Sequence, residues 1–281
     1  MNKLINTLIF GIIFYCSVVD TEVVQVSESD LPLFQRKVQA RIVGGTRSGH
    51  NQFPYTVSIR AYNGSSTSFC GGSMISSTYI LTAAHCTRGF HDFEIGLGSI
   101  VLNTPATKIF TYGGAIEHPE FNPSNLNNDI ALIKVPIIPS NIPSVTLVLL
   151  PRYSQAEKSF VGAQATVSGF GRTSDTSNNV SPFMEYVTLK VIHNKECFDL
   201  YGKRIVTDNV LCAKGIDKMY NACLGDSGGP LVAKDGGIHV QIGIVSFVSS
   251  RGCAEGDPSG YTRVSKYLKW ISSKTGIRIR D

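Results

Sequence analysis

The sequence has few charged residues, a single tryptophan and, beyond its first twenty residues, no long apolar run. Charged side chains make up 17% of the 281 residues, and the formal net charge is +5. Without a long run of lysine and arginine, the sequence gives no indication of nucleic-acid binding. Without a second long apolar run, it gives none of a membrane span. No two cysteines have the C-x-x-C spacing, which argues against a zinc site.

The residues that are present predict a globular, all-β protein. Hydrophobic residues make up 42% of the chain, enough for a sizeable core. Short segments of alternating apolar residues, such as Thr56–Arg60 and residues 187–191 and 240–246, are separated by many of the 27 glycines and 12 prolines. This pattern is typical of a β-sandwich or β-barrel. Only the C-terminal segment, about residues 264–275, has apolar residues at helical spacing.

The first twenty residues are interpreted as a secretory signal peptide. Lys3 supplies a positive start, an apolar run follows from Leu4 to Val19, and we expect cleavage between Cys16 and Thr21. The protein should then be secreted and extracellular. Removal of the signal leaves six of the seven cysteines. An even number in a secreted chain indicates disulfides, but on the order of 15 pairings are open from the sequence alone.

Three motifs carry the chemistry. The run Gly225–Pro230 reads G-D-S-G-G-P and places Ser227 between an acid and two glycines. His85 lies in L-T-A-A-H-C, and Asp129 opens the apolar run N-D-I-A-L-I. With these motifs in the order His, Asp, Ser, residues 42–281 resemble the chymotrypsin-like serine proteases.

The resemblance implies an all-β fold of two antiparallel β-barrels packed together with a C-terminal α-helix. The first barrel would cover about residues 42–145, the second about 146–263 and the helix about 264–275. It implies the disulfides Cys70–Cys86, Cys197–Cys212 and Cys223–Cys253. It also implies no cofactor and no metal: the stretch that matches the calcium loop of some members, residues 94–104, has one acid only.

The resemblance assigns catalytic roles to His85, Asp129 and Ser227. An imidazole can take the proton of a serine hydroxyl, and an aspartate can fix the imidazole tautomer and stabilise the imidazolium. The amides of Gly225 and Ser227 would form the oxyanion hole. Ser246 would support the aspartate, and the backbone after it would pair with substrate as an added strand.

The segment 21–41 matches an activation peptide. It ends in Arg41, and Ile42-Val43-Gly44-Gly45 follows. We expect a trypsin-like protease to cut after Arg41, and the new ammonium group of Ile42 to enter the protein and pair with Asp226. That pair would fix the backbone of the oxyanion hole. Because residues 21–41 contain no cysteine, the cut peptide should dissociate.

Substrate preference is predicted from the positions that match the family's primary pocket. Its base is Asn221, six positions before Ser227, and its walls include Val248 and Ser259, with Ser246 beside them. An uncharged base and a narrowing valine favour cleavage after Leu, Met, Phe or Tyr, in the manner of chymotrypsin and elastase, with small residues such as Ala as the second choice. An inward turn of Asp257 would instead attract basic side chains.

A second function class stays open in the sequence: a catalytically marginal binding or regulatory protein on the protease scaffold. The intact His, Asp and Ser positions and the intact cut site favour the enzyme. As partners we expect protein or peptide substrates, an activating protease and protein protease inhibitors, with no nucleic acid, no membrane and a monomeric state. Asn63 and Asn179 match the glycosylation pattern.

Overall fold

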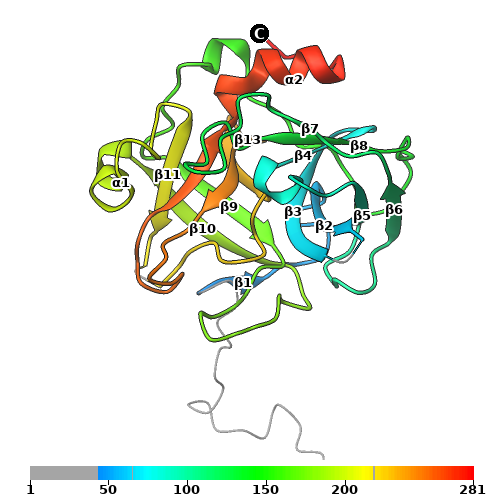
Figure 1. Cartoon of the computed structure of the whole chain (residues 1–281), viewed down its shortest axis with the longest axis horizontal. Helices are drawn as coiled ribbons and strands as arrows, with labels where there is room; N and C mark the ends of the chain where they lie inside the picture. The colour runs from blue at the N-terminus through cyan, green and yellow to red at the C-terminus, as the bar shows by residue number, and fades with distance from the viewer. Residues whose placement is uncertain (1–43, 65, 218) are drawn as a thin grey trace, which may run out of the picture. The chain divides into compact units, whose positions relative to one another are not determined.

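The computed structural model describes residues 44–281 except residues 65 and 218. The predicted signal and activation peptides therefore lie outside the described residues. The described residues all belong to one compact unit. Two antiparallel sheets dominate this unit, and the colour change along the chain in Figure 1 separates them.

The first sheet has seven strands in the order β6-β5-β2-β3-β4-β8-β7. It curves into a half-barrel, because its edge strands β6 and β7 do not pair with each other in the described part of the chain. Its strands are β2 (Thr56–Asn63), β3 (Ser66–Ser76), β4 (Tyr79–Thr82), β5 (Asp92–Leu97), β6 (Thr107–Thr111), β7 (Ile116–Glu117) and β8 (Ala131–Lys134). Alternate residues such as Ile59, Ile80 and Ile95 are fully buried and form its core.

The second sheet closes into a six-stranded barrel, because β9 pairs with both β10 and β12. Its strands are β9 (Gln164–Gly169), β10 (Glu185–Ile192), β11 (Val210–Gly215), β12 (Pro230–Asp235), β13 (Ile238–Phe247) and β14 (Ser259–Arg263). The short β1 (Thr46–Arg47), from the start of the described chain, pairs with the outer edge of β10. The all-β fold class of the sequence analysis is confirmed.

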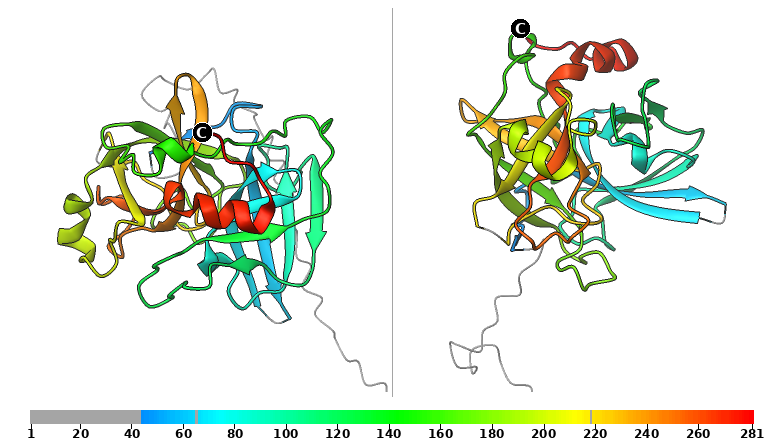
Figure 2. Two further views of the ribbon diagram at one scale, coloured as in Figure 1. Left: turned by 90° about the horizontal axis from the view of Figure 1, so that it is seen from above. Right: turned by 60° about the vertical axis from the view of Figure 1, so that its left-hand side comes forward.

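The chain ends in the expected helix, although its first turn is tighter than an α-helix. Val264–Tyr267 form a 3-10 turn, and α2 (Leu268–Thr275) continues from it until Gly276 adopts the left-handed conformation, with φ at 72°. Leu268 and Ile271 belong to the core cluster of the first sheet, so α2 packs over that sheet even though it follows the second (Figure 2). None of the helices among the described residues is long and apolar enough to cross a membrane.

A further helix, α1 (Asn194–Tyr201), was not predicted. Its apolar period is weak, because Cys197 is its one fully buried side chain. Cys197 forms a disulfide with Cys212 on β11, and Gly202 ends the helix. The other two disulfides are Cys70–Cys86 and Cys223–Cys253, so all three pairs are those that the family resemblance implies.

Buried hydrogen bonds join the two sheets. Thr56 Oγ1 on β2 lies 2.6 Å from Ser168 Oγ on β9, and Ser73 Oγ on β3 donates to Gln241 Oε1 on β13 at 2.6 Å. Unpaired, such groups would each cost about 1–3 kcal/mol, so these contacts favour one relative placement of the sheets.

Candidate active site

Strand pairing brings His85 and Asp129 together. Strands β4 and β8 are antiparallel, with Thr82 opposite Ala131. His85 follows the end of β4 in the 3-10 turn Ala84–Cys86, and Asp129 comes just before β8 begins. The two side chains therefore leave the same end of one strand pair, although they are 44 positions apart in the sequence.

Asp129 is fully buried and accepts three hydrogen bonds. Its Oδ1 accepts from the backbone N–H of His85 at 2.9 Å, and its Oδ2 lies 2.8 Å from His85 Nδ1. Ser246 Oγ donates to the same Oδ2 at 2.6 Å, which is the contact that the resemblance implies. The register of β13 against β14 shifts between Val245 and Phe247, and this bulge contains Ser246.

The His85 ring has two opposing influences on its charge. Burial lowers the pKa of His85, but the hydrogen bond to Asp129 and the negative charge of Asp129 raise it by more, so the pKa lies above its usual value. With Nδ1 directed at Asp129, Nε2 is the nitrogen left for proton transfer.

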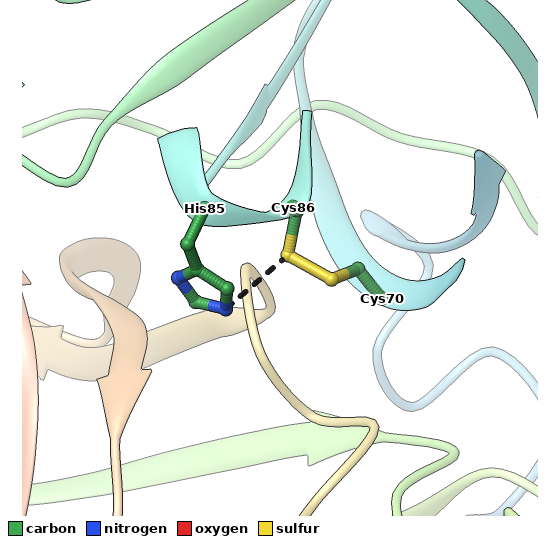
Figure 3. Close-up of side chains that lie close together, drawn as sticks. All are labelled: Cys70, His85 and Cys86. Atoms are coloured by element: carbon green, nitrogen blue, oxygen red, sulfur yellow. Dashed lines mark hydrogen bonds between the residues drawn. A yellow bond between two sulfur atoms is a disulfide. The ribbon is translucent and has the colours of Figure 1, made fainter. Parts of the chain in front are cut away.

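In this structure Nε2 faces sulfur. It lies 3.6 Å from Cys86 Sγ, beside the Cys70–Cys86 disulfide (Figure 3). Ser227 Oγ makes no hydrogen bond to any described residue, so the contact between Ser227 and His85 is not formed here. Hydrogen bonds of this kind often shorten only when substrate is bound. Both sulfurs are in a disulfide and lack the thiolate that a metal would need.

Ser227 lies in a turn whose backbone requires glycine on both sides of the Asp226-Ser227 pair. Gly225 and Gly228 have φ values of 98° and 79°, and a Cβ on Gly228 would lie 2.1 Å from Thr82 Oγ1. The Ser227 carbonyl accepts from Gly71 N–H at 2.7 Å, which ties the turn to β3. Among the described residues, the amides of Gly225 and Ser227 have no acceptor. They are therefore available to a ligand.

The side chain of Asp226, which is part of this turn, is fully buried. Its carboxylate accepts from Gly171 N–H at 2.8 Å and Cys223 N–H at 3.0 Å. Burial raises the pKa of Asp226 to about 6, although the two amide hydrogen bonds act in the opposite direction. No cationic side chain among the described residues pairs with it. Arg41 and Ile42, its expected partners in activation, lie outside the described residues.

Asn221, the expected base of the pocket, is hydrogen-bonded to Ser259, one of its expected wall residues. Asn221 is 1% exposed, and its Nδ2 donates to the Asp257 carbonyl at 2.8 Å. Its Oδ1 accepts from Ser259 Oγ at 2.7 Å and Ala222 N–H at 2.9 Å. Val248 is half-buried against the Cys223–Cys253 disulfide. The Asn221 side chain is thus polar and uncharged, and both of its polar atoms are hydrogen-bonded.

Arg251 forms a salt bridge with the carboxylate of Asp257. Its Nε donates to Asp257 Oδ2 at 2.9 Å, and its Nη2 contacts Oδ1. The hydrogen bond from Arg251 lowers the pKa of Asp257, against a smaller opposite effect of burial. Asp257 is therefore paired within its own loop and does not stand free for a substrate cation. The sequence analysis missed Arg251, for which an opposite charge six residues away was the available signal.

Two more contacts were missed and had no sequence signal. Thr262 Oγ1 donates to the Asp129 carbonyl at 2.6 Å, so β14 of the second sheet also holds the segment that carries Asp129. Tyr267 Oη donates to Asn128 Oδ1 at 2.8 Å from the C-terminal turn. In residues 94–104, which match the calcium loop of some family members, the single acid Glu94 pairs with Arg60 at 3.1 Å and Lys108 at 3.2 Å.

Four matches, one to a family model and three to known proteins, each cover most of the chain. The model of the family described as Trypsin matches residues 42–271. Serine protease 1 of Drosophila melanogaster is 35% identical over 243 residues, which are 86% of this chain and 88% of that protein. Trypsin-3 of Salmo salar is 36% identical over 234 residues, 83% of this chain and 92% of that protein. A solved structure of HL collagenase matches with a TM-score of 0.77 at 34% identity, covering 85% of this chain and 100% of that one.

Proposed function

The chain belongs to the trypsin family and is a chymotrypsin-like serine endopeptidase, and we propose that Ser227, His85 and Asp129 carry out its reaction. One observation carries the assignment. The buried carboxylate of Asp129 holds His85 Nδ1 at 2.8 Å while Ser246 holds the carboxylate, which fixes the tautomer that a general base needs.

The proposed reaction requires Ser227 Oγ and His85 Nε2 to come within hydrogen-bond distance when substrate binds. As Ser227 Oγ attacks the substrate carbonyl, His85 Nε2 takes the hydroxyl proton and the tetrahedral oxyanion forms. The two unused amides of Gly225 and Ser227 would bind that oxyanion, each contributing about 3 kcal/mol in the transition state. His85 then gives the proton to the leaving amine, and the acyl group stays on Ser227. Water, deprotonated by His85, releases the acid and restores the serine.

Covalent labelling tests the assignment of the nucleophile. A biotinylated fluorophosphonate should label the activated enzyme on Ser227, and Ser227→Ala should abolish both the label and the turnover. Ser246→Ala, which leaves the nucleophile and the base in place, should still be labelled, more slowly. A folded Ser227→Ala variant that kept more than a tenth of the wild-type rate would refute the assignment.

For activation, we propose a secreted zymogen that is cut after Arg41. Three disulfides agree with an oxidising, extracellular environment. Asp226 supports the second half of the proposal. Its carboxylate is fully buried, has no cationic partner within the described part of the chain and has a raised pKa, so it would gain from a neighbouring ammonium. The Ile42 ammonium, once freed, would be that partner and would stabilise the turn from residue 225 to 228.

For specificity, we propose cleavage after uncharged residues, with Leu, Met, Phe and Tyr preferred to Arg and Lys. A substrate cation at the Asn221 base would lose water and meet only neutral dipoles, at a cost of several kcal/mol. The pairing of Asp257 with Arg251 supports this preference, because the Asp257 carboxylate is already engaged by a cation. Val248 narrows the entrance, which keeps Ala as the second choice.

A further inference from the structure

A cavity of about 410 Å³ lies away from the site described above, where the outside of the second sheet meets the segment before β2. Nine residues line it: Phe53, Tyr55, Ala163, Gln164, Thr166, Thr188, Val232, Lys234 and His239. Its volume falls within the range of about 300–1,000 Å³ that small-molecule sites occupy. The proposed reaction uses none of these residues.

Strand alternation explains why polar groups face this cavity. Ala165 and Val167 of β9 point into the barrel core, so Gln164 and Thr166 point outward. Thr166 is opposite Thr188 on β10 and opposite Val232 on β12, so all three share the outer face. The hydroxyls of Thr166 and Thr188 lie 3.3 Å apart. Two residues after Val232 on β12, Lys234 lies on the same outer face and is opposite His239 of β13.

Tyr55 covers this face from the first half of the chain. Its ring packs edge-on to the ring of His239, with centroids 6.2 Å apart, and Phe53 packs beside it at 6.4 Å. Tyr55 is 3% exposed, yet its hydroxyl makes no hydrogen bond within the described part of the chain. The hydroxyl oxygen keeps some exposure to solvent, so it is not enclosed in the core. Tyr55 Oη is therefore a donor without an acceptor among the described residues, on a side chain that lines the cavity.

The charges at the rim have one sign. No aspartate or glutamate lines the cavity, whereas Lys234 and His239 do. Lys234 Nζ forms no ion pair with the described residues. Its neighbour Asp235 points to the other side of β12, where Gln155 Nε2 donates to it at 2.8 Å and Lys158 lies 3.4 Å away. An anion in the cavity would therefore meet a free ammonium, an imidazole and a phenol donor.

We propose that this cavity binds a small organic acid with an aromatic or branched aliphatic body. The carboxylate would accept from Tyr55 Oη and Lys234 Nζ, and the body would lie against Phe53 and Val232. The lining is mixed: Phe53 and Val232 offer apolar surface that a fully hydrated inorganic anion would leave uncovered. The free donors disfavour a neutral hydrocarbon, which would leave Tyr55 unpaired.

The test is calorimetric titration of the full chain with naphthalene-2-carboxylate. We expect saturable binding of one molecule, and binding of the neutral naphthalene-2-carboxamide at least about tenfold weaker. Tyr55→Phe, which removes one hydroxyl, should weaken binding of the acid about fivefold, and Lys234→Gln about tenfold. Lys269→Gln, an exposed lysine on α2, is the matched control and should change nothing.

Thermal unfolding of each variant shows that the fold is kept. Two results would overturn the proposal. One is the absence of saturable binding up to millimolar concentration. The other is equal affinity in wild type, Tyr55→Phe and Lys234→Gln, which would place the probe in another site such as the substrate pocket.

Discussion

Replacing Asp129 by asparagine should nearly abolish catalysis while leaving the fold intact. The backbone N–H of His85 donates to Oδ1 at 2.9 Å, so that position must stay an oxygen. The amide nitrogen must then take the place of Oδ2, facing His85 Nδ1. The opposite orientation would set two donors against each other in a buried site, at a cost of about 1–3 kcal/mol.

In the favoured orientation the asparagine donates to His85 Nδ1 and moves the ring proton to Nε2. A protonated Nε2 cannot accept the hydroxyl proton of Ser227. Loss of the correct tautomer lowers kcat by about 10⁴ in the general case of this triad, which corresponds to about 5.5 kcal/mol of transition-state stabilisation. We expect a loss of this order here.

The variant should also differ in its pH profile. In the wild type the negative charge of Asp129 outweighs burial and holds the pKa of His85 above its usual value. Activity requires the neutral ring, so wild-type kcat/KM should fall on the acid side from a pH above about 6.5. Without that charge only burial remains, and the acid limb should move to lower pH. The stability that the His85–Asp129 pair provides is complete below about pH 6.5 and is lost as pH rises through the higher folded-state pKa.

The assay is kcat/KM on a peptide amide substrate from pH 5 to 9, with thermal unfolding as the test of folding. Ser246→Ala is the matched control, because it removes a hydrogen bond to Oδ2 but keeps the carboxylate and the tautomer. It should lose about tenfold, from a bond worth about 1.5 kcal/mol. An Asp129→Asn variant with more than a tenth of wild-type activity, or a Ser246→Ala variant equally impaired, would refute the reasoning.

Three further predictions concern activation and specificity. Arg41→Gln should block activation by trypsin, measured as turnover after incubation, and full activity in an uncut chain would contradict the pairing of Ile42 with Asp226. Because the pKa of Asp226 is raised to about 6, the uncut folded chain keeps a proton that the unfolded chain releases near pH 4, so its free energy of unfolding should fall by about 3 kcal/mol between about pH 4 and pH 7. Urea unfolding relative to Asp226→Asn measures this, and a difference that does not vary with pH would exclude it. Among peptide amides that differ only in the residue before the cut bond, Leu and Phe should exceed Arg and Lys in kcat/KM, and Arg251→Ala should narrow the gap; a wild-type preference for Arg would overturn the pocket assignment.

What the sequence could predict depended on how local each signal was. Strands such as β10 and β13 alternate strictly, and the residues around Ser227, His85 and Asp129 form contiguous motifs, so the fold class and the candidate triad positions were predictable. Helix α1 was not, because eight residues with one buried side chain leave almost no period. Contacts such as Thr262 to Asp129 join positions 133 apart, and only the strand order brings them together. Tyr55 likewise meets the outer face of the second sheet only in the folded chain, so no signal in the sequence predicts its position at the cavity.

Asp129 is held from both sides of the molecule: by His85 on the first sheet, and by Ser246 and Thr262 on the second. The geometry of the site therefore depends on how the two sheets are placed relative to each other. A small slip between the sheets would break these short contacts while leaving every strand ladder intact. Heat or denaturant should therefore inactivate the enzyme before its β-sheets unfold. Substitutions intended to keep the enzyme active at higher temperature should accordingly strengthen the contacts between the two sheets before the packing within either sheet.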